Sequence, residues 1–190
     1  MDAALTVVRE KGYTATTVDD ICAQSGVSKG SFFHHFKSKE ELVLATVEHW
    51  NAMTGAFFET APYHALPDPR DRLLGYVDFR GLIMEGEVSE FTCLLGTLVQ
   101  ETYLTHPDLR HACEAGMAAH IALLVRDVEA ARSLYAPTAE WSAESLGYFI
   151  QSVLQGAFIF AKAKQGPDMA RQSLTHLKAY LENLLPKNAQ

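Results

Sequence analysis

The sequence has few cysteines and no long apolar run. Its 190 residues include three cysteines, Cys22, Cys93 and Cys113, with no CxxC pair. An odd, unpaired set argues against a disulfide framework and favours reduced, mostly buried thiols. No apolar segment reaches the roughly 18 residues that a membrane-spanning helix needs. The first residues, with an acid at Asp2 and amphipathic spacing, do not resemble a secretory signal. We therefore expect a cytoplasmic protein without a membrane partner.

Motifs for catalysis and metal binding are also missing. The sequence has no His pair at i,i+4, no nucleophile elbow and no Gly-rich phosphate loop. His106, Cys113 and His120 recur every seven residues on one predicted helix. Each interval climbs about 10 Å along that helix, which is too far for ligands of one ion. We therefore expect no enzyme activity, no metal site and no cofactor.

Strand-like alternation is absent, whereas helical periodicity runs through the whole chain. Hydrophobic residues make up 48% and charged residues 21%, which are ordinary values for a globular protein. The pattern predicts an all-α fold of nine helices and no sheet. We place them at about 2–11, 17–25, 28–35, 38–61, 69–85, 90–105, 107–135, 142–165 and 167–185.

The stretch SKGSFFHHFKSKEEL, from Ser28 to Leu42, is unusual in an acidic chain. The formal net charge is -7, yet the residues from Ser25 to Lys39 include three lysines, two histidines and no acid. Two short predicted helices meet here at a turn containing Gly26, which is typical of a helix-turn-helix motif. The second helix of such a motif lies in the DNA major groove. We therefore predict a DNA-binding domain at residues 1–47 and a second domain at residues 48–190.

The aromatic residues of this stretch divide between core and surface. Phe32 and Phe36 are four residues apart on the predicted helix, so we expect both to pack in the small core. Phe33 points in another direction, and we expect an exposed ring. His34 and His35 are adjacent and do not share a helical face, which favours contacts to phosphates or bases over a shared metal ion.

The segment TTVDDICAQSGVSKGSFFHHFKSKEELVLATVE resembles the DNA-binding domain of the tetracycline-repressor (TetR) family of transcriptional regulators. The resemblance covers about residues 2–48 and is carried by GYTATTVDDIC, GVSKGS and FFHHFKSKEEL. It implies phosphate contacts from Thr17 and Lys39. It also implies contacts in the groove from Ser28, Lys29, Gly30, Ser31, Phe33, His34 and His35. Family members usually have Tyr at the position of Phe33, and often at that of His34, so this chain lacks those hydroxyls.

The same resemblance implies that the rest of the chain is a helical domain for ligand binding and dimerisation. The helix predicted at about 142–165 is apolar over more than half its circumference, and the last helix carries one apolar stripe. Together they suit a four-helix bundle between two subunits, and a core within one chain is the alternative. The predicted dimer interface comprises Phe149, Val153, Gly156, Phe160, Leu174, Leu177, Leu181 and Leu184.

We expect an effector pocket within the helices spanning about 69–160. Its candidate lining residues are Phe79, Met84, Phe91, Cys93, Leu98, Tyr103, His120, Tyr148 and Phe158. Most are apolar, which favours a small, largely hydrophobic ligand with one or two polar groups. The segment FTCLLGTLVQETYLTHPDLR resembles part of some family members that sense electrophiles. No cation lies within one helical turn of Cys93, which favours a packed thiol and leaves electrophile sensing as the alternative.

The sequence as a whole thus predicts a homodimeric transcriptional regulator that responds to a ligand. We expect a repressor that binds a palindromic double-stranded DNA operator and is released by a small-molecule effector. The alternative is a helical small-molecule-binding protein with weak or lost DNA binding. The acidic total charge and the missing hydroxyls at Phe33 and His34 motivate that alternative.

Overall fold

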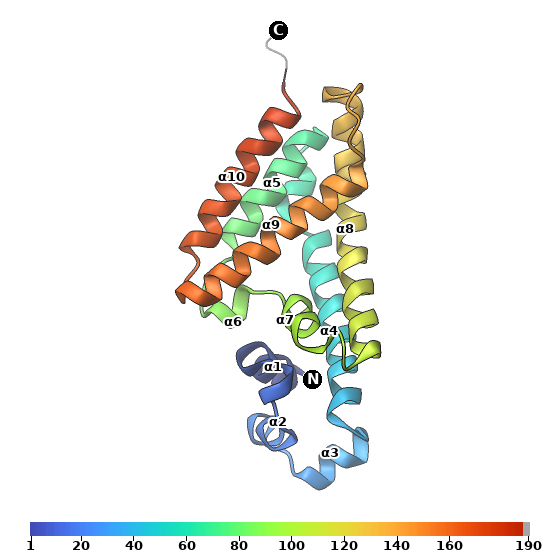
Figure 1. The fold of residues 1–190 in the computed structure, drawn as a ribbon, viewed down its shortest axis with the longest axis vertical. Coiled ribbons are helices and arrows are strands. Elements are labelled where there is room, and N and C mark those ends of the chain that lie inside the picture. The colour runs from blue at the N-terminus through green and yellow to red at the C-terminus, as the bar shows by residue number, and fades with distance from the viewer. Residues whose placement is uncertain (188–190) are drawn as a thin grey trace. The chain divides into compact units, whose positions relative to one another are not determined.

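The computed structural model describes residues 1–187, and this part of the chain contains α-helices, one short 3-10 helix and no strand. The predicted all-α class is therefore confirmed. Residues 1–187 form ten α-helices, one more than predicted, because the segment expected as one helix at about 90–105 is divided into α6 and α7. The helices are α1 (Asp2–Ala15), α2 (Val18–Ser25), α3 (Lys29–His35), α4 (Lys39–Glu59), η1 (Pro62–Ala65), α5 (Pro69–Leu82), α6 (Val88–Phe91), α7 (Leu94–Thr102), α8 (Pro107–Tyr135), α9 (Ala143–Lys164) and α10 (Asp168–Leu184) (Figure 1).

The chain divides into two compact units. The first unit comprises Met1–Ala56 with Thr92–Ala118, and the second comprises Phe57–Phe91 with Ala119–Gln190. Helices α1, α2, α3 and α7 therefore belong to the first unit, and α5, α9 and α10 belong to the second. This division does not follow the predicted one at residue 47, and that functional boundary remains a prediction.

Local capping defines the short helices of the first unit. Thr17 and Asp20 form a capping box at the start of α2, and Gly26 ends α2 in the left-handed conformation at φ 70°. The Ser28 hydroxyl then accepts a hydrogen bond from the backbone N–H of Ser31 at the start of α3. These caps fix a tight turn between the two helices, as a helix-turn-helix requires.

Two apolar clusters fill the first unit. The smaller one packs together α1, α2, α3 and the start of α4, which we call the reading head. It contains Ala4, Ile21, Cys22, Phe32 and Leu42, with Val18 and Phe36 packed against it. The larger one joins α1 and α4 to α7 and α8, and it contains Leu5, Val8, Tyr13, Val43, Val47, Leu94, Leu95, Leu98, Leu109 and Cys113. Phe32 is only 4% exposed, so its spacing with Phe36 did indicate core packing.

The second unit is a bundle in which α10 packs on both α5 and α9 (Figure 1). Gly147 of α9 faces the second-unit part of α8, where a Cβ atom would lie 3.0 Å from Cγ2 of Ile121. This glycine therefore permits a close approach of the two helices. Gly156, on the same helix, has no atom within 4 Å of the corresponding position and belongs to an open face.

Within residues 1–187, no helix combines the length and the apolar character that crossing a membrane requires. The same residues contain no group of three or more His, Cys, Asp or Glu side chains arranged to hold a metal ion.

Candidate nucleic-acid interface and ligand site

The surface of α3 presents most of the predicted DNA contacts. Lys29, Gly30, Ser31, His34 and His35 are all exposed. The ring of Phe33 is 54% exposed, although its edge-to-face neighbour Phe32 is buried. A short helix that is held by one apolar face and leaves rings, hydroxyls and cations outside has the form of a recognition helix.

Two predicted contacts serve as helix caps. The Thr17 hydroxyl donates to the Asp20 carboxylate at 2.7 Å and accepts from the Asp20 backbone N–H at 3.1 Å. The Ser28 oxygen accepts from the N–H of Ser31 at 3.1 Å. Both residues therefore position α2 and α3, whatever they contact on DNA.

Lys29 forms an exposed ion pair with Asp19, with Nζ and Oδ1 2.9 Å apart. The sequence analysis placed no acid close to Lys29, so its pairing with Asp19 of α2 was not predicted. Exposed pairs of this kind contribute at most about 1 kcal/mol, so a phosphate can replace Asp19 at low cost.

Lys39 differs most from its predicted role as a phosphate contact. Its ammonium donates to the backbone oxygens of Tyr13 and Thr16, each at 2.8 Å, and lies 4.2 Å from the centre of the Tyr13 ring. Burial lowers the pKa of this lysine. A cation on the last carbonyls of α1 stabilises the helix end. Lys39 therefore ties α1 to the start of α4.

Lys37 is a candidate contact that the sequence analysis did not assign. Its side chain is exposed directly after the end of α3, and it forms no ion pair with any described residue. The Glu41 carboxylate accepts a hydrogen bond from the Lys37 backbone N–H at 2.6 Å. This bond orients the Lys37 backbone and leaves the side-chain ammonium available. The sequence feature that could have identified Lys37 is its position between the end of α3 and the start of α4.

The second unit contains a cluster of aromatic and polar side chains. The Tyr76 hydroxyl lies 3.0 Å from Nε2 of His120, and Nε2 of Gln151 donates to the same hydroxyl at 2.7 Å. Rings of Phe58 and Tyr76 flank the imidazole at centroid distances of 4.8 and 5.9 Å. Burial, with a smaller contribution from Arg80, lowers the pKa of His120 to about 4. The imidazole is therefore neutral at physiological pH.

Arg80 of α5 adds a positive charge to this cluster. Its guanidinium carbon lies 5.1 Å from the ring centre of Phe58, 5.5 Å from that of Phe158 and 5.9 Å from that of Tyr76. These rings come from α4, α9 and α5, so three helices enclose one cation. We refer to Phe58, Tyr76, Arg80, His120, Gln151 and Phe158 as the Arg80 cluster.

The predicted effector residues are spread over both units. His120 and Phe158 belong to the Arg80 cluster, and Phe79 contacts Phe58 with ring centres 6.0 Å apart. Met84 is buried, and Tyr148 lies exposed on α9. Cys93, Leu98 and Tyr103 belong to the first unit, whereas Phe91 belongs to the second. The sequence analysis did not assign Tyr76, Arg80 or Gln151, because polar residues spaced along different helices give no local motif.

Cys93 and Cys113 lie near each other in the first unit. Cys93 is half-buried at the start of α7, and Cys113 is fully buried. Burial raises the pKa of the Cys113 thiol to about 12, with a further contribution from Cys93. The Cys113 thiol is therefore protonated and unreactive at neutral pH.

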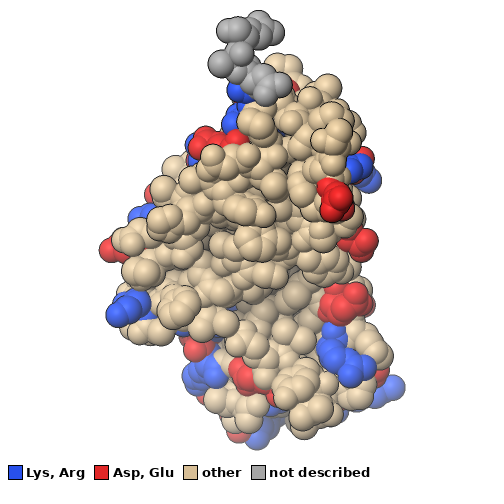
Figure 2. Space-filling model, turned by 45° about the horizontal axis from the view of Figure 1, so that its top comes forward, with Lys and Arg blue, Asp and Glu red and all other residues tan. Residues whose placement is uncertain are grey.

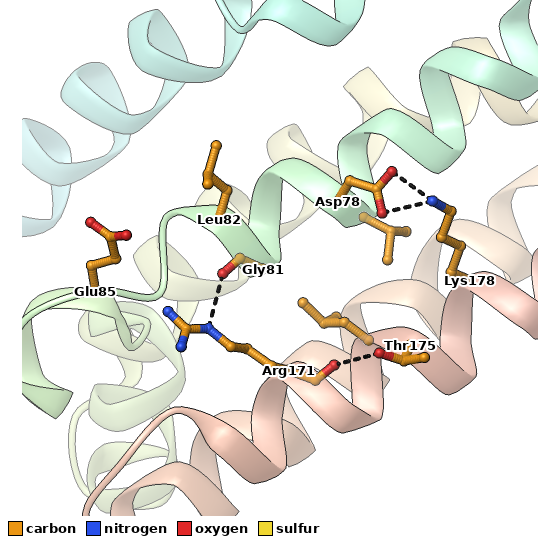
Figure 3. Close-up of a pocket in the computed structure, with 9 residues that line it drawn as sticks. Asp78, Gly81, Leu82, Glu85, Arg171, Thr175 and Lys178 are labelled. Carbon is orange, nitrogen blue, oxygen red and sulfur yellow. Dashed lines mark hydrogen bonds and ion pairs between the residues drawn. The ribbon is translucent and has the colours of Figure 1, made fainter.

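A groove of about 570 Å³ runs between α5 and α10 (Figure 3). Its two basic side chains already have partners. Lys178 bridges both carboxylate oxygens of Asp78 at 2.9 and 2.7 Å, and Arg171 donates to the backbone oxygens of Gly81 and Met84. A groove whose basic side chains already have partners offers a ligand fewer free donors than the Arg80 cluster does.

The outer face of α9 and α10 is apolar. Helix α9 has no charged residue between Glu144 and Lys162, and Figure 2 shows a broad uncharged area on the side where α9 lies in front. The large exposed side chains of this face, which we call the α9–α10 face, are Tyr148, Phe149, Ile159, Phe160, Met169 and Tyr180. Phe149 and Tyr180 connect the two helices, with ring centres 5.1 Å apart.

The predicted interface residues divide between this face and the core. Phe149 and Phe160 are exposed, while Val153, Gly156 and Leu184 are partly exposed. Leu174, Leu177 and Leu181 are at most 4% exposed and pack inside the protomer. The stripe of α10 therefore supplies the core within one chain, which was the alternative reading.

Two family models match the chain. One, described as "Bacterial regulatory proteins, tetR family", matches residues 1–46. The other, described as "Transcriptional regulator LmrA/YxaF-like, C-terminal domain", matches residues 76–172. The first match covers α1, α2, α3 and the start of α4, and the second runs from within α5 to the start of α10.

Similar proteins include named regulators. The transcriptional regulator AcuR of Cereibacter sphaeroides is 29% identical over 171 residues, covering 87% of this chain and 76% of AcuR. The HTH-type transcriptional repressor NemR of Escherichia coli is 26% identical over 171 residues, covering 89% and 85% of the two chains. The uncharacterized HTH-type regulator YerO of Bacillus subtilis is 47% identical over 45 residues, which are 24% of this chain and only 16% of YerO. The crystal structure of E. coli NemR in its reduced form has the same fold, with a TM-score of 0.81 at 23% identity over 100% of this chain and 98% of that one.

Proposed function

Because the chain belongs to the TetR family of transcriptional regulators, we propose that it is a homodimeric repressor whose two α3 helices bind a palindromic operator. It acts in the cytoplasm and leaves its operator when a small molecule binds the second unit. The observation that carries the proposal is the arrangement of α3. Ser28 caps this helix and Phe32 packs it on the core, while Lys29, Phe33 and both histidines are exposed to solvent.

The DNA contacts divide into two kinds. Exposed Lys29 and Lys37 lie at the two ends of α3, where they reach phosphates on either side of the major groove. Ser31, His34 and His35 lie between them and are available to base edges and sugars. The hydroxyls that Tyr would supply at positions 33 and 34 are replaced by the apolar ring of Phe33 and by His34, which retains a polar nitrogen.

Dimerisation uses the α9–α10 face. A second copy of the chain seated there by a two-fold axis buries the same aromatic side chains on both partners. Phe160 is 59% exposed and Ile159 is 49% exposed. Large apolar side chains exposed together in this way are typical of an interaction surface. Gly156 lies between the exposed ends of this stripe and lets the two α9 helices approach closely.

The Arg80 cluster is the effector site in this proposal. It combines several aromatic walls with a small number of polar groups, which is the usual composition of a ligand site. A ligand that favours one arrangement of these helices weakens operator binding by the free energy that couples the two sites, typically about 1–3 kcal/mol.

Selection of duplexes from a random DNA pool by the purified protein tests the DNA part of the proposal. We expect enrichment of a sequence with two-fold symmetry and affinity that falls steeply with salt concentration. The stoichiometry on the selected duplex should be an even number of chains. If no sequence is enriched, the chain acts as a helical small-molecule-binding protein without an operator, which is the alternative function.

A further inference from the structure

Arg80 is unusual among the described arginines of the second unit because one of its donors is buried without a hydrogen-bond partner. Its Nε atom is buried and has no hydrogen-bond partner, and no described carboxylate forms an ion pair with its guanidinium. Arg72, two turns earlier on α5, shows the ordinary arrangement. Its Nε lies 2.8 Å and its Nη2 2.7 Å from the Asp127 carboxylate. Arg80 therefore keeps donors unused that Arg72 has satisfied.

The aromatic rings around Arg80 do not use those donors. Cation–π contacts with Phe58, Phe158 and Tyr76 hold the charge at 5.1–5.9 Å from the ring centres. They leave the N–H groups, which lie in the guanidinium plane, without acceptors. A buried N–H without an acceptor is destabilising, and the usual acceptor for a planar guanidinium is a carboxylate, which binds two N–H groups at once.

The neighbouring polar groups already have partners among themselves. The Tyr76 hydroxyl and Nε2 of His120 share a hydrogen bond, and the Tyr76 oxygen accepts the Gln151 N–H. The Tyr76 hydroxyl and this imidazole nitrogen are therefore both occupied. Asp127 is occupied by Arg72. The full charge that remains unpaired in the cluster at neutral pH is thus the positive charge of Arg80.

From this arrangement we infer that the Arg80 cluster binds the carboxylate of a small organic acid with an apolar body. The carboxylate pairs with the guanidinium of Arg80, and the body packs against Phe58, Phe79 and Phe158. The inference rests on the proposed function, since it takes the cluster to be the effector site. It adds a negative charge to the largely hydrophobic ligand that the sequence predicts.

Matched pairs of probes test this charge requirement. Benzoate and hexanoate are compared with their neutral counterparts benzamide and hexanamide by calorimetric titration and thermal unfolding, at constant ionic strength and pH 7.5. We expect both carboxylates to bind and to raise the unfolding temperature, and neither amide to do so. The inference is overturned if neither carboxylate binds, or if each amide binds as tightly as its acid.

Two variants assign the effect to Arg80. Arg80→Met keeps a long apolar side chain and removes the charge, and we expect it to weaken carboxylate binding about 10- to 150-fold. Arg126→Met is the matched control, because Arg126 is an exposed arginine on α8. It should bind the carboxylates as the unmodified protein does. Equal binding by Arg80→Met would overturn the assignment. If that variant does not fold, Arg80→Lys, which keeps the charge but loses the planar fork, should still show weakened binding.

Operator binding separates this inference from the proposed function. Carboxylates that bind the cluster without changing the affinity for a selected duplex would refute the effector mechanism and leave the carboxylate site intact. Release from the duplex by a neutral compound, with no carboxylate binding, would refute the carboxylate site and leave the regulator intact.

Discussion

His120 should make the stability of this protein depend on pH between about 5 and 6.5. The residue is neutral in the folded chain because burial and nearby Arg80 lower its pKa to about 4, from the ordinary value of 6.5. The unfolded chain takes up a proton as the pH falls through 6.5, whereas the folded chain does not. The unfolded state therefore binds more protons, and the free energy of unfolding decreases as the pH falls.

The size of the effect follows from the two pKa values. Between pH 7.5 and pH 5, a group whose pKa falls from 6.5 to about 4 on folding removes about 2 kcal/mol from the free energy of unfolding. This is a large part of the roughly 5–15 kcal/mol that stabilises a typical domain. Carboxylates with lowered pKa values, such as that of Asp68, add their losses mainly below this window.

Urea unfolding at fixed protein concentration, repeated from pH 5 to pH 7.5, measures the effect. His120→Gln removes the titration and keeps a group that can hydrogen-bond the Tyr76 hydroxyl, so its stability should vary about 2 kcal/mol less over this range. His111→Gln, at an exposed position of the same helix, should keep the dependence of the unmodified protein. Parallel curves for the unmodified protein and His120→Gln would refute the assignment of a neutral, buried imidazole.

Four further results are expected. Lys39→Ala should lower the free energy of unfolding by about 1–3 kcal/mol without DNA, since the last carbonyls of α1 lose their donor; unchanged urea curves would contradict this cap. Lys37→Ala should weaken operator binding and reduce the slope of log affinity against log salt by about 1, as measured by fluorescence anisotropy; an unchanged slope would remove Lys37 from the phosphate contacts. Phe160→Asp should yield folded monomers in sedimentation, whereas Leu177→Asp should lose helical circular dichroism, and an intact Phe160→Asp dimer would place the interface elsewhere. Cys113 should resist iodoacetamide at pH 8 in the folded protein, and rapid modification would contradict its burial.

The reading head could be predicted closely because its signals are local. The turn at Gly26, the cap at Ser28 and the spacing of Phe32 and Phe36 each involve residues within a few positions of one another. What the sequence missed there was contact between distant segments. The partner of Lys39 is the end of α1, more than 20 residues earlier, and no local pattern distinguishes such a cap from an exposed lysine.

The Arg80 cluster was beyond sequence reasoning for the same reason. Tyr76 and Arg80 are one turn apart on α5, but His120 and Gln151 lie on α8 and α9. Only packing brings the imidazole to the phenol, and only packing leaves the guanidinium without a carboxylate. The aromatic choices Phe79 and Phe158 came from composition, which identifies residues suited to a pocket but does not say which of them meet.

The proposed dimer interface differs from the predicted one in the part that α10 plays. Helix α10 has one apolar stripe, and a single stripe can be buried only once. Helix α10 packs on α5 and α9. Its residues Leu174, Leu177 and Leu181 are therefore buried in the core of the protomer itself. Helix α9 is apolar over more than half its circumference, so after its inner residues are buried it still presents Phe149 and Phe160 outward. An excess of apolar surface over what one core requires therefore indicates which helix faces a partner, and in the proposed dimer that helix is α9.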